Sequence, residues 1–272
     1  MSNFTQRFLT AVVGATVVVS LTWLGGWPFA GLMVAVALAA QYELYGLLRA
    51  ANVRPLVGLG LALGAVAVVA PLVEAAAAIL VVGGIAALVA TLYTRKETPL
   101  LDVSGTLYGV LYPSALAGLI VLLRVNEADW LVGPEAFWLT TAVLFCIWGA
   151  DTFAYFAGRA FGRHKLFERV SPNKTWEGAA GGAVGSFLVA TGFKVAVLSS
   201  VLTWMDVAAL ALACGVASQF GDLVESLFKR SVGVKDSATW LPGHGGLLDR
   251  IDAALVAVPL VVVYLHLVKG VW

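Results

Sequence analysis

The chain has 272 residues, of which 60% are hydrophobic and 12% are charged, and its formal net charge at pH 7 is +1. Charged residues make up roughly a quarter of a soluble domain, so this composition excludes a soluble protein and predicts a polytopic membrane protein. The near-neutral charge also argues against a nucleic-acid partner, because a surface that follows phosphates needs a clear excess of Lys and Arg. Polar residues are confined to short loops, which predicts one integrated membrane domain.

Several apolar stretches are long enough to cross the bilayer, since a membrane helix needs about 20 apolar residues. The nine predicted spans are residues 8–26, 28–48, 55–73, 75–93, 103–123, 136–158, 178–200, 204–226 and 251–268. The first is interpreted as a span rather than a signal peptide, because no small-x-small cleavage site followed by a soluble domain comes after it. Gln41 and Glu43 interrupt the second span, and Lys194 interrupts the seventh. The predicted fold is an all-α integral membrane bundle of about nine transmembrane helices.

Lys and Arg are distributed asymmetrically when the loops between these spans are read alternately. One face has only Arg124 and Lys269, and the opposite face collects Arg7, Arg49, Arg54, Arg95, Lys96, Arg159, Arg163, Lys165, Arg169, Lys174, Lys229, Arg230, Lys235 and Arg250. Cytoplasmic loops carry the excess of Lys and Arg, so we expect the N-terminus and the charged C-terminal loops in the cytoplasm, in a multi-pass protein of the inner (cytoplasmic) membrane. Cys146 and Cys214 lie in apolar stretches, where they are expected to pack as small hydrophobic residues.

Two polar clusters precede the most charged one. In residues 151–165, Asp151 lies inside a predicted span, where a carboxylate costs about 2.5–3.5 kcal/mol, and it is either an internal salt-bridge or cap partner or a site residue. In residues 171–178, Thr175 is predicted to cap a helix that begins near Trp176, which places Lys174 at the helix end that attracts anions. A capped helix with an interfacial tryptophan and a topological lysine is the simpler interpretation of this second cluster.

The seventh predicted span is rich in glycine. Its glycines are Gly178, Gly181, Gly182 and Gly185. Small residues let membrane helices approach closely, whereas a phosphate-binding glycine loop needs a polar setting, so helix packing is the favoured interpretation. Walker-type phosphate loops, the H-E-x-x-H motif and nucleophile elbows are absent from the sequence.

The segment from Gly221 to Asp252 carries the densest charge of the chain, between two apolar stretches. Asp222, Glu225 and Lys229 are spaced by three and four residues, which places them on one helix face, and Asp249 and Asp252 share a face in the same way. Carboxylates gathered at a low-dielectric boundary repel one another unless a cation intervenes. A divalent metal with hard oxygen ligands meets that need. The cations expected to hold phosphate oxygens are Lys229, Arg230, Lys235 and Arg250.

Together these residues form a long pattern that resembles the signature of the phosphatidate cytidylyltransferase (CDP-diacylglycerol synthase) family. The pattern runs Ser226-x-x-Lys229-Arg230, Lys235-Asp236-x-Ala238, Leu241-Pro242-Gly243-His244-Gly245-Gly246 and Asp249-Arg250-x-Asp252. It extends upstream through Gly221-Asp222-x-x-Glu225-Ser226, Ser171-Pro172-x-Lys174-Thr175-x-Glu177-Gly178 and Asp151-Thr152-x-Ala154-Tyr155-Phe156-x-Gly158-Arg159. Ala238 stands where the family commonly has glycine, and Asn173 where it frequently has a second basic residue. We therefore expect residues 1–130 to hold N-terminal spans without a matched motif, and residues 131–272 to hold the catalytic spans.

The resemblance implies a Mg²⁺-dependent nucleotidyltransferase that converts CTP and phosphatidic acid into CDP-diacylglycerol and pyrophosphate in phospholipid biosynthesis. The number of metal ions and the oligomeric state, a homodimer included, stay open. The candidate catalytic residues are Asp222, Lys229, Arg230, Lys235, Asp249 and Arg250, and the candidate metal ligands are Asp222 and Asp249 with Asp252 and Glu225 as helpers. Further candidate ligand contacts are Lys174, Arg159, Ser171, His244 and Gly245.

Two other classes of function are compatible with part of the pattern. A CTP-dependent lipid kinase would use similar cations and a metal, but it would transfer the γ-phosphoryl group. A secondary transporter would explain many spans and buried charges without chemistry, but it predicts charges near the bilayer midplane. The densest charge here is predicted at one membrane face, which favours an enzyme.

Overall fold

The computed structural model of the protein describes residues 3–93, 98–125, 134–238 and 245–270, leaving aside the side chains of residues 3–9 and 11. The N-terminal elements are α1 (Asn3–Leu24), α2 (Gly26–Ala50), α3 (Val57–Val69), η1 (Ala70–Leu72), α4 (Ala76–Ala90) and η2 (Thr91–Tyr93). The central elements are α5 (Pro99–Gly109), the π-helical turn η3 (Val110–Ala115), α6 (Leu116–Val125) and α7 (Glu135–Phe161). They are followed by β1 (Lys165–Phe167), β2 (Ser171–Thr175), α8 (Trp176–Ala196), α9 (Trp204–Leu212), the π-helical turn η4 (Ala213–Ala217), α10 (Ser218–Ser231) and α11 (Leu248–Lys269).

In the described ranges, seven helices are long and apolar enough to cross a membrane. Three of these spans are composite, because each joins several elements: α4 with η2, α5 with η3 and α6, and α9 with η4 and α10. The predicted spans 8–26 and 55–73 correspond to the shorter apolar helices Val12–Leu24 and Val57–Leu72. The predicted all-α, multi-pass membrane fold is therefore confirmed.

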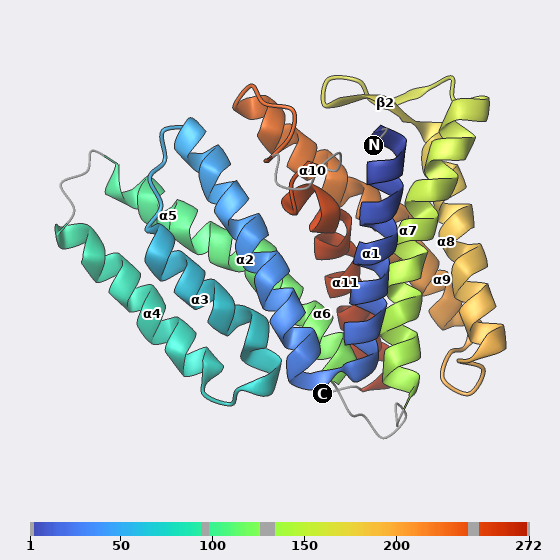
Figure 1. Cartoon of the computed structure of the whole chain (residues 1–272), viewed down its shortest axis with the longest axis horizontal. Coiled ribbons are helices and arrows are strands. Elements are labelled where there is room, and N and C mark those ends of the chain that lie inside the picture. Colours follow the sequence, from blue (N-terminus) through green and yellow to red (C-terminus); the bar gives the residue numbers. More distant parts are fainter. Residues whose placement is uncertain (1–2, 94–97, 126–133, 239–244, 271–272) are drawn as a thin grey trace. The chain divides into compact units, whose positions relative to one another are not determined.

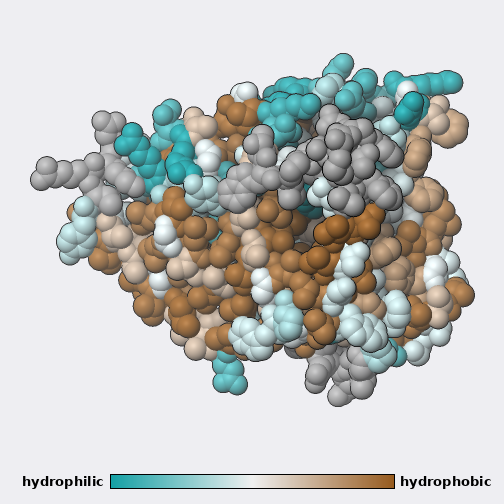
Figure 2. Space-filling view, in the orientation of Figure 1, coloured by the Kyte–Doolittle hydropathy of each residue, from teal (hydrophilic) through white to brown (hydrophobic). Residues whose placement is uncertain are grey.

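The outer surface of the helices has the character expected of a lipid-facing one. Figure 2 shows hydrophobic side chains over the flanks of the helices, and among the exposed ones are Val81, Leu212 and Leu267. Hydrophilic residues gather on the β1–β2 hairpin, at the upper right of the view, where Arg163 and Lys165 are exposed. Large apolar surface of this kind is stable only against another apolar medium.

The helices group into two compact units. The first unit contains Met1–Leu122 and Phe228–Arg250, and the second contains Leu123–Leu227 and Ile251–Trp272. Phe228–Arg250 carries much of the sequence signature, yet it packs with the N-terminal spans, in which the sequence shows no motif. These spans therefore support part of the candidate site.

In the first unit, α2 packs against α3, α5 and η3, and α3 packs against α4 (Figure 1). Gln41 of α2 is fully buried, and its amide donates hydrogen bonds to the Tyr45 hydroxyl at 2.7 Å and to the Gly60 carbonyl at 2.8 Å. The Ser114 hydroxyl donates to the Gln41 carbonyl oxygen at 2.7 Å. Because protein groups satisfy its polar atoms, Gln41 is compatible with a membrane-spanning α2.

In the second unit, α7 and α8 pack along each other (Figure 1). A Cβ atom built on Gly181 would lie 2.3 Å from the Cβ of Ala157, and one built on Gly185 would lie 2.5 Å from the side chain of Phe153. Only a residue without a side chain permits this approach, so the prediction that these α8 glycines serve helix packing is confirmed.

The connection between α7 and α8 is an antiparallel hairpin, where the sequence predicted a loop. It pairs Lys165 with Thr175 and Phe167 with Ser171. Thr175 caps α8 as predicted, since its hydroxyl accepts a hydrogen bond from the Gly178 N–H at 3.1 Å. Short paired segments of this kind lack the alternating apolar pattern that predicts a strand, which explains why the sequence predicted a loop.

Candidate active site

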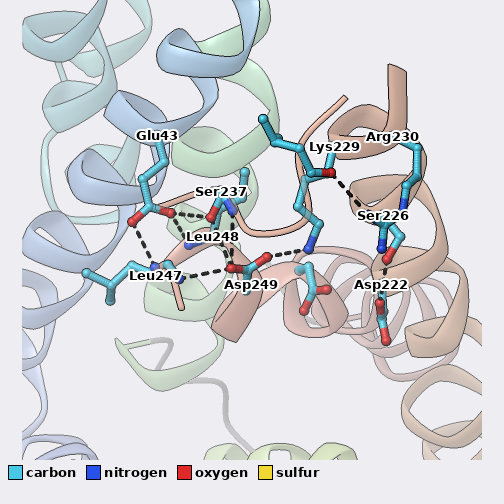
Figure 3. A network of polar contacts seen from close by, with 12 residues as sticks. Glu43, Asp222, Ser226, Lys229, Arg230, Ser237, Leu247, Leu248 and Asp249 are labelled. Carbon is cyan, nitrogen blue, oxygen red and sulfur yellow. Dashed lines mark hydrogen bonds and ion pairs between the residues drawn. The ribbon is translucent and has the colours of Figure 1, made fainter. Parts of the chain in front are cut away.

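Lys174 and Asp222 form an ion pair in the second unit, between the hairpin and α10. The Lys174 Nζ lies 2.6 Å from Asp222 Oδ2, and the two side chains are 24% and 41% exposed. The Ser226 hydroxyl donates to Asp222 Oδ1 at 3.2 Å (Figure 3). Lys174 directly precedes Thr175, the N-cap of α8, and a cation at this positive end of a helix is unfavourable without an anion. Asp222 supplies that anion, and a phosphate oxygen would meet the same need.

Asp252 belongs to the same charged group of the second unit. Its side chain is buried, and it interacts electrostatically with Asp222, Asp151 and Lys174. A Cβ atom built on Gly221 would lie 2.3 Å from the Asp252 carbonyl oxygen, so α10 and α11 approach each other at backbone distance. The negative charges of Asp222 and Asp151 thus act on a buried carboxylate.

Lys229 and Asp249 form a second ion pair, within the first unit. The Lys229 ammonium donates to Asp249 Oδ1, and the two side chains are only 10% and 9% exposed. Asp249 Oδ2 accepts a hydrogen bond from the Gly246 N–H at 2.9 Å and lies 3.2 Å from the Ser237 hydroxyl oxygen (Figure 3). Lys229 lies in the last turn of α10 and Asp249 in the first turn of α11, where the helix dipoles favour their charges. The pair is therefore nearly dry.

Glu43 of α2 also reaches this part of the first unit, and the sequence did not place it in the site. Its buried carboxylate accepts hydrogen bonds from the Ser237 hydroxyl and from the N–H groups of Leu247 and Leu248 (Figure 3). The available signal was an acidic residue inside an apolar span, which is costly in a membrane and therefore often functional. In the hydropathy pattern, Glu43 was interpreted only as an interruption of the second predicted span.

The structure describes the position of every other candidate residue except His244. Arg230 donates to the Val234 carbonyl at 3.2 Å, and Arg159 donates to the Tyr155 hydroxyl at 3.1 Å. Lys235 and Arg250 are exposed, whereas Glu225 is fully buried. Ser171 is the first residue of β2, and Gly245 has a positive φ of 76°. His244 lies outside the described residues. The roles given to all of these residues stay predictions.

The second unit offers carboxylate oxygens, the kind of ligand that Mg²⁺ prefers. Among the described residues, no group of three or more His, Cys, Asp or Glu side chains is arranged to hold a metal ion. Mg²⁺ in nucleotide-dependent enzymes usually needs only one or two carboxylates, because water and substrate phosphates supply the other oxygens. Asp222 and Asp252 offer such a pair in one electrostatic cluster. Asp249 belongs to the first unit, and its predicted share in a metal site stays a prediction.

Comparison with known proteins covers almost the whole chain. The family model described as "Cytidylyltransferase family" matches residues 5–268. A phosphatidate cytidylyltransferase of Brucella abortus is 38% identical over 97% of this chain and 94% of its own length. Proteins of the same name from Synechocystis sp. and Bacillus subtilis are 33% and 34% identical, each over at least 95% of both chains. The chain therefore belongs to the cytidylyltransferase family, as its signature residues predicted.

Proposed function

We propose that this protein transfers the cytidylyl group of CTP to phosphatidic acid, which gives CDP-diacylglycerol and pyrophosphate. The observation that carries the proposal is the match, over nearly the full length of both chains, to relatives named phosphatidate cytidylyltransferase. The multi-pass fold supports it, because one substrate is a membrane lipid. A lipid kinase or a transporter has no such support from the relatives.

The reaction needs alignment and charge neutralisation more than acid or base chemistry. A phosphate oxygen of the lipid, already anionic at neutral pH, forms a bond to the α-phosphorus of CTP. The bond from that phosphorus to the oxygen that bridges to the β-phosphorus breaks, and its electron pair leaves with pyrophosphate. No proton has to be removed from the nucleophile. Both reactants are polyanions, so the main task of the protein is to hold them together in line.

The two ion pairs supply the cations for this task. Lys174 is held by Asp222 at the N-terminus of α8, where a phosphate oxygen would be bound by the ammonium and by the positive helix end. Lys229 is held by Asp249, and a carboxylate partner keeps the ammonium charged and oriented while it is nearly buried. We assign both lysines to phosphate binding. Which lysine binds CTP and which binds the lipid can be tested by measuring KM for each substrate in the single variants.

Asp222 and Asp252 are the residues that we propose to hold Mg²⁺. The ion, when bound, supplies positive charge that stabilises the departing pyrophosphate. The electrostatic interaction of Asp252 with two other carboxylates supports this assignment, because a cation relieves that repulsion. Since CTP is a cytoplasmic metabolite, we further propose that the charged loops face the cytoplasm from the inner membrane.

The proposal is tested with the purified full-length protein in phosphatidate-containing detergent micelles, with Mg²⁺ and CTP labelled in either the α- or the γ-phosphate. We expect the α-label in the lipid and the γ-label in pyrophosphate. Transfer of the γ-label to the lipid would establish a kinase instead. If neither label reached the lipid and no pyrophosphate were released, both the transferase and the kinase would be contradicted.

The same assay tests the metal ligands. Asp222→Asn should raise the Mg²⁺ concentration required for half-maximal rate. It should also lower kcat roughly 100-fold, because the negative charge that develops in the transition state would be less well neutralised. Glu168→Gln, which changes an exposed carboxylate of the hairpin, is the matched control and should keep the wild-type Mg²⁺ dependence. A wild-type Mg²⁺ curve for Asp222→Asn would remove this residue from the metal site.

A further inference from the structure

Glu43 binds the segment that carries the end of the sequence signature. The Ser237 hydroxyl donates to Glu43 Oε2 at 2.8 Å, the Leu247 N–H to Oε1 at 2.9 Å, and the Leu248 N–H to Oε2 at 2.9 Å. The side chain is 3% exposed, so water does not compete for these bonds. The donors Ser237, Leu247 and Leu248 lie 194 to 205 residues further along the chain. Figure 3 shows the carboxylate facing these three residues.

The contacts explain why a charged residue is tolerated at this position. α11 begins at Leu248, and the first N–H groups of a helix have no acceptor within the helix. The N–H groups of Leu247 and Leu248 are of this kind, and Glu43 accepts from both. The positive end of the helix dipole and the charged acceptor strengthen each other. The cost of a carboxylate in an apolar span is thereby offset by one specific partner, the start of α11.

Ser237 connects Glu43 with Asp249. Its hydroxyl lies 2.8 Å from Glu43 Oε2 and 3.2 Å from Asp249 Oδ2. A hydroxyl has one proton, so it donates to one carboxylate at a time, and the shorter contact is to Glu43. The position of Ser237 is therefore shared by both acids, and a change at Glu43 alters the surroundings of Asp249.

Gly246 makes this arrangement possible. A Cβ atom on Gly246 would lie 2.0 Å from the Ser237 hydroxyl oxygen and 2.3 Å from Glu43 Oε2, so any side chain would displace one of them. Without a side chain, Gly246 brings its own N–H to Asp249 Oδ2 at 2.9 Å. Glu43, Ser237 and Asp249 thus enclose the backbone directly before α11, and Asp249 in turn holds the Lys229 ammonium.

We propose that Glu43 is a positioning residue for the transferase reaction. By fixing Ser237 and the first turn of α11, it sets the orientation of Asp249 and, through Asp249, the direction of the Lys229 ammonium. The inference rests on the proposed function, and it gives the N-terminal spans a definite part in it. Glu43 touches no substrate in this scheme.

The test compares Glu43→Gln with Glu74→Gln in the purified full-length protein. Glutamine keeps the shape of Glu43 but replaces one acceptor oxygen by an NH₂ donor, which cannot accept the hydrogen bonds of that oxygen. We expect kcat to fall about 10-fold or more while KM for CTP changes less than about two-fold. Glu74 is an exposed acid of the same unit, and its variant should keep wild-type kinetics. Glu43→Asp, which retains both acceptor oxygens, should recover part of the lost kcat.

A second comparison separates positioning from a general effect on folding. Because Glu43 acts partly through Ser237, the kcat decreases of Glu43→Gln and Ser237→Ala should combine to less than their product in the double variant. Full multiplication of the two decreases would overturn the proposal. So would a wild-type kcat per folded molecule in Glu43→Gln, or in Ser237→Ala if the glutamine variant does not fold. A wild-type protein without cytidylyl transfer would refute the proposed function itself, which is a distinguishable result.

Discussion

The two lysine–aspartate pairs of the candidate active site use the same residue types in different surroundings. The side chains of Lys229 and Asp249 are 10% and 9% exposed, whereas Lys174 and Asp222 are 24% and 41% exposed. Solvent screens the second pair, so its breakage should have little effect on stability. The first pair is nearly dry, and removing one partner would leave an uncompensated charge in the interior. Stability measurements can therefore distinguish the pairs even where both affect turnover.

For the dry pair, we expect Asp249→Asn to abolish measurable turnover and to lower the free energy of unfolding by about 3–5 kcal/mol. The double variant Lys229→Met with Asp249→Asn removes both charges, so it should recover most of the melting temperature without recovering activity. Thermal unfolding in detergent and pyrophosphate release measure the two effects. Full turnover in the folded Asp249→Asn variant would take Asp249 out of the reaction.

At the scale of elements, glycines set the distance between helices that carry charged residues. Gly221 of α10 faces the backbone of α11 at Asp252, and the glycines of α8 face α7. The contact of Gly221 is with backbone, which cannot move aside as a flexible side chain can, so this position tolerates no Cβ atom. The packing thereby fixes where the carboxylate of Asp252 lies relative to Asp222.

This contact predicts opposite effects for two glycine substitutions in the second unit. Gly221→Ala would place a Cβ atom 2.3 Å from the Asp252 carbonyl oxygen, and overpacking of this kind costs about 1–3 kcal/mol. Gly192→Ala meets no atom within 4 Å, and alanine favours a helix over glycine by about 0.5–1 kcal/mol. Melting temperatures in detergent should fall for the first variant and stay equal or rise for the second. An unchanged melting temperature for Gly221→Ala would contradict the close approach of α10 and α11.

At the scale of the whole molecule, the orientation in the membrane follows from the distribution of charge. The hairpin between α7 and α8 carries several of the cations that we place in the cytoplasm, and the loop after α8 carries none. These two loops lie at opposite ends of α8, which is apolar and long enough to cross a membrane. A label that cannot cross the bilayer should therefore reach them from different sides.

Single cysteines introduced as Glu168→Cys in the hairpin and Ser199→Cys after α8 test this orientation. Both native residues are exposed, whereas the native cysteines Cys146 and Cys214 are buried and should contribute little background labelling. In inside-out vesicles an impermeant maleimide should label Glu168→Cys, and in intact spheroplasts it should label Ser199→Cys. The unsubstituted protein controls for background. The reverse pattern would invert the proposed topology.

Several features could be predicted without the tertiary structure because each depends on a local pattern. Runs of apolar residues predicted the membrane helices, Thr175 before Trp176 predicted the start of α8, and the glycines of α8 predicted close packing. In each case the signal and its consequence lie within one segment. The hairpin before α8 was missed because its strands are too short to show a period.

The membrane class, the helical elements, the family and the candidate charged residues could all be predicted from the amino-acid sequence, since composition and motif are properties of the chain alone. Which charged groups meet is visible in the three-dimensional fold alone: Lys174 with Asp222, Lys229 with Asp249, and Glu43 with the start of α11. These pairings join segments that are up to 205 residues apart, and the periodicity of a segment carries no information about its distant partner. The same distance explains Glu43, which interrupts α2 when that helix is considered alone and is satisfied once α11 begins beside it.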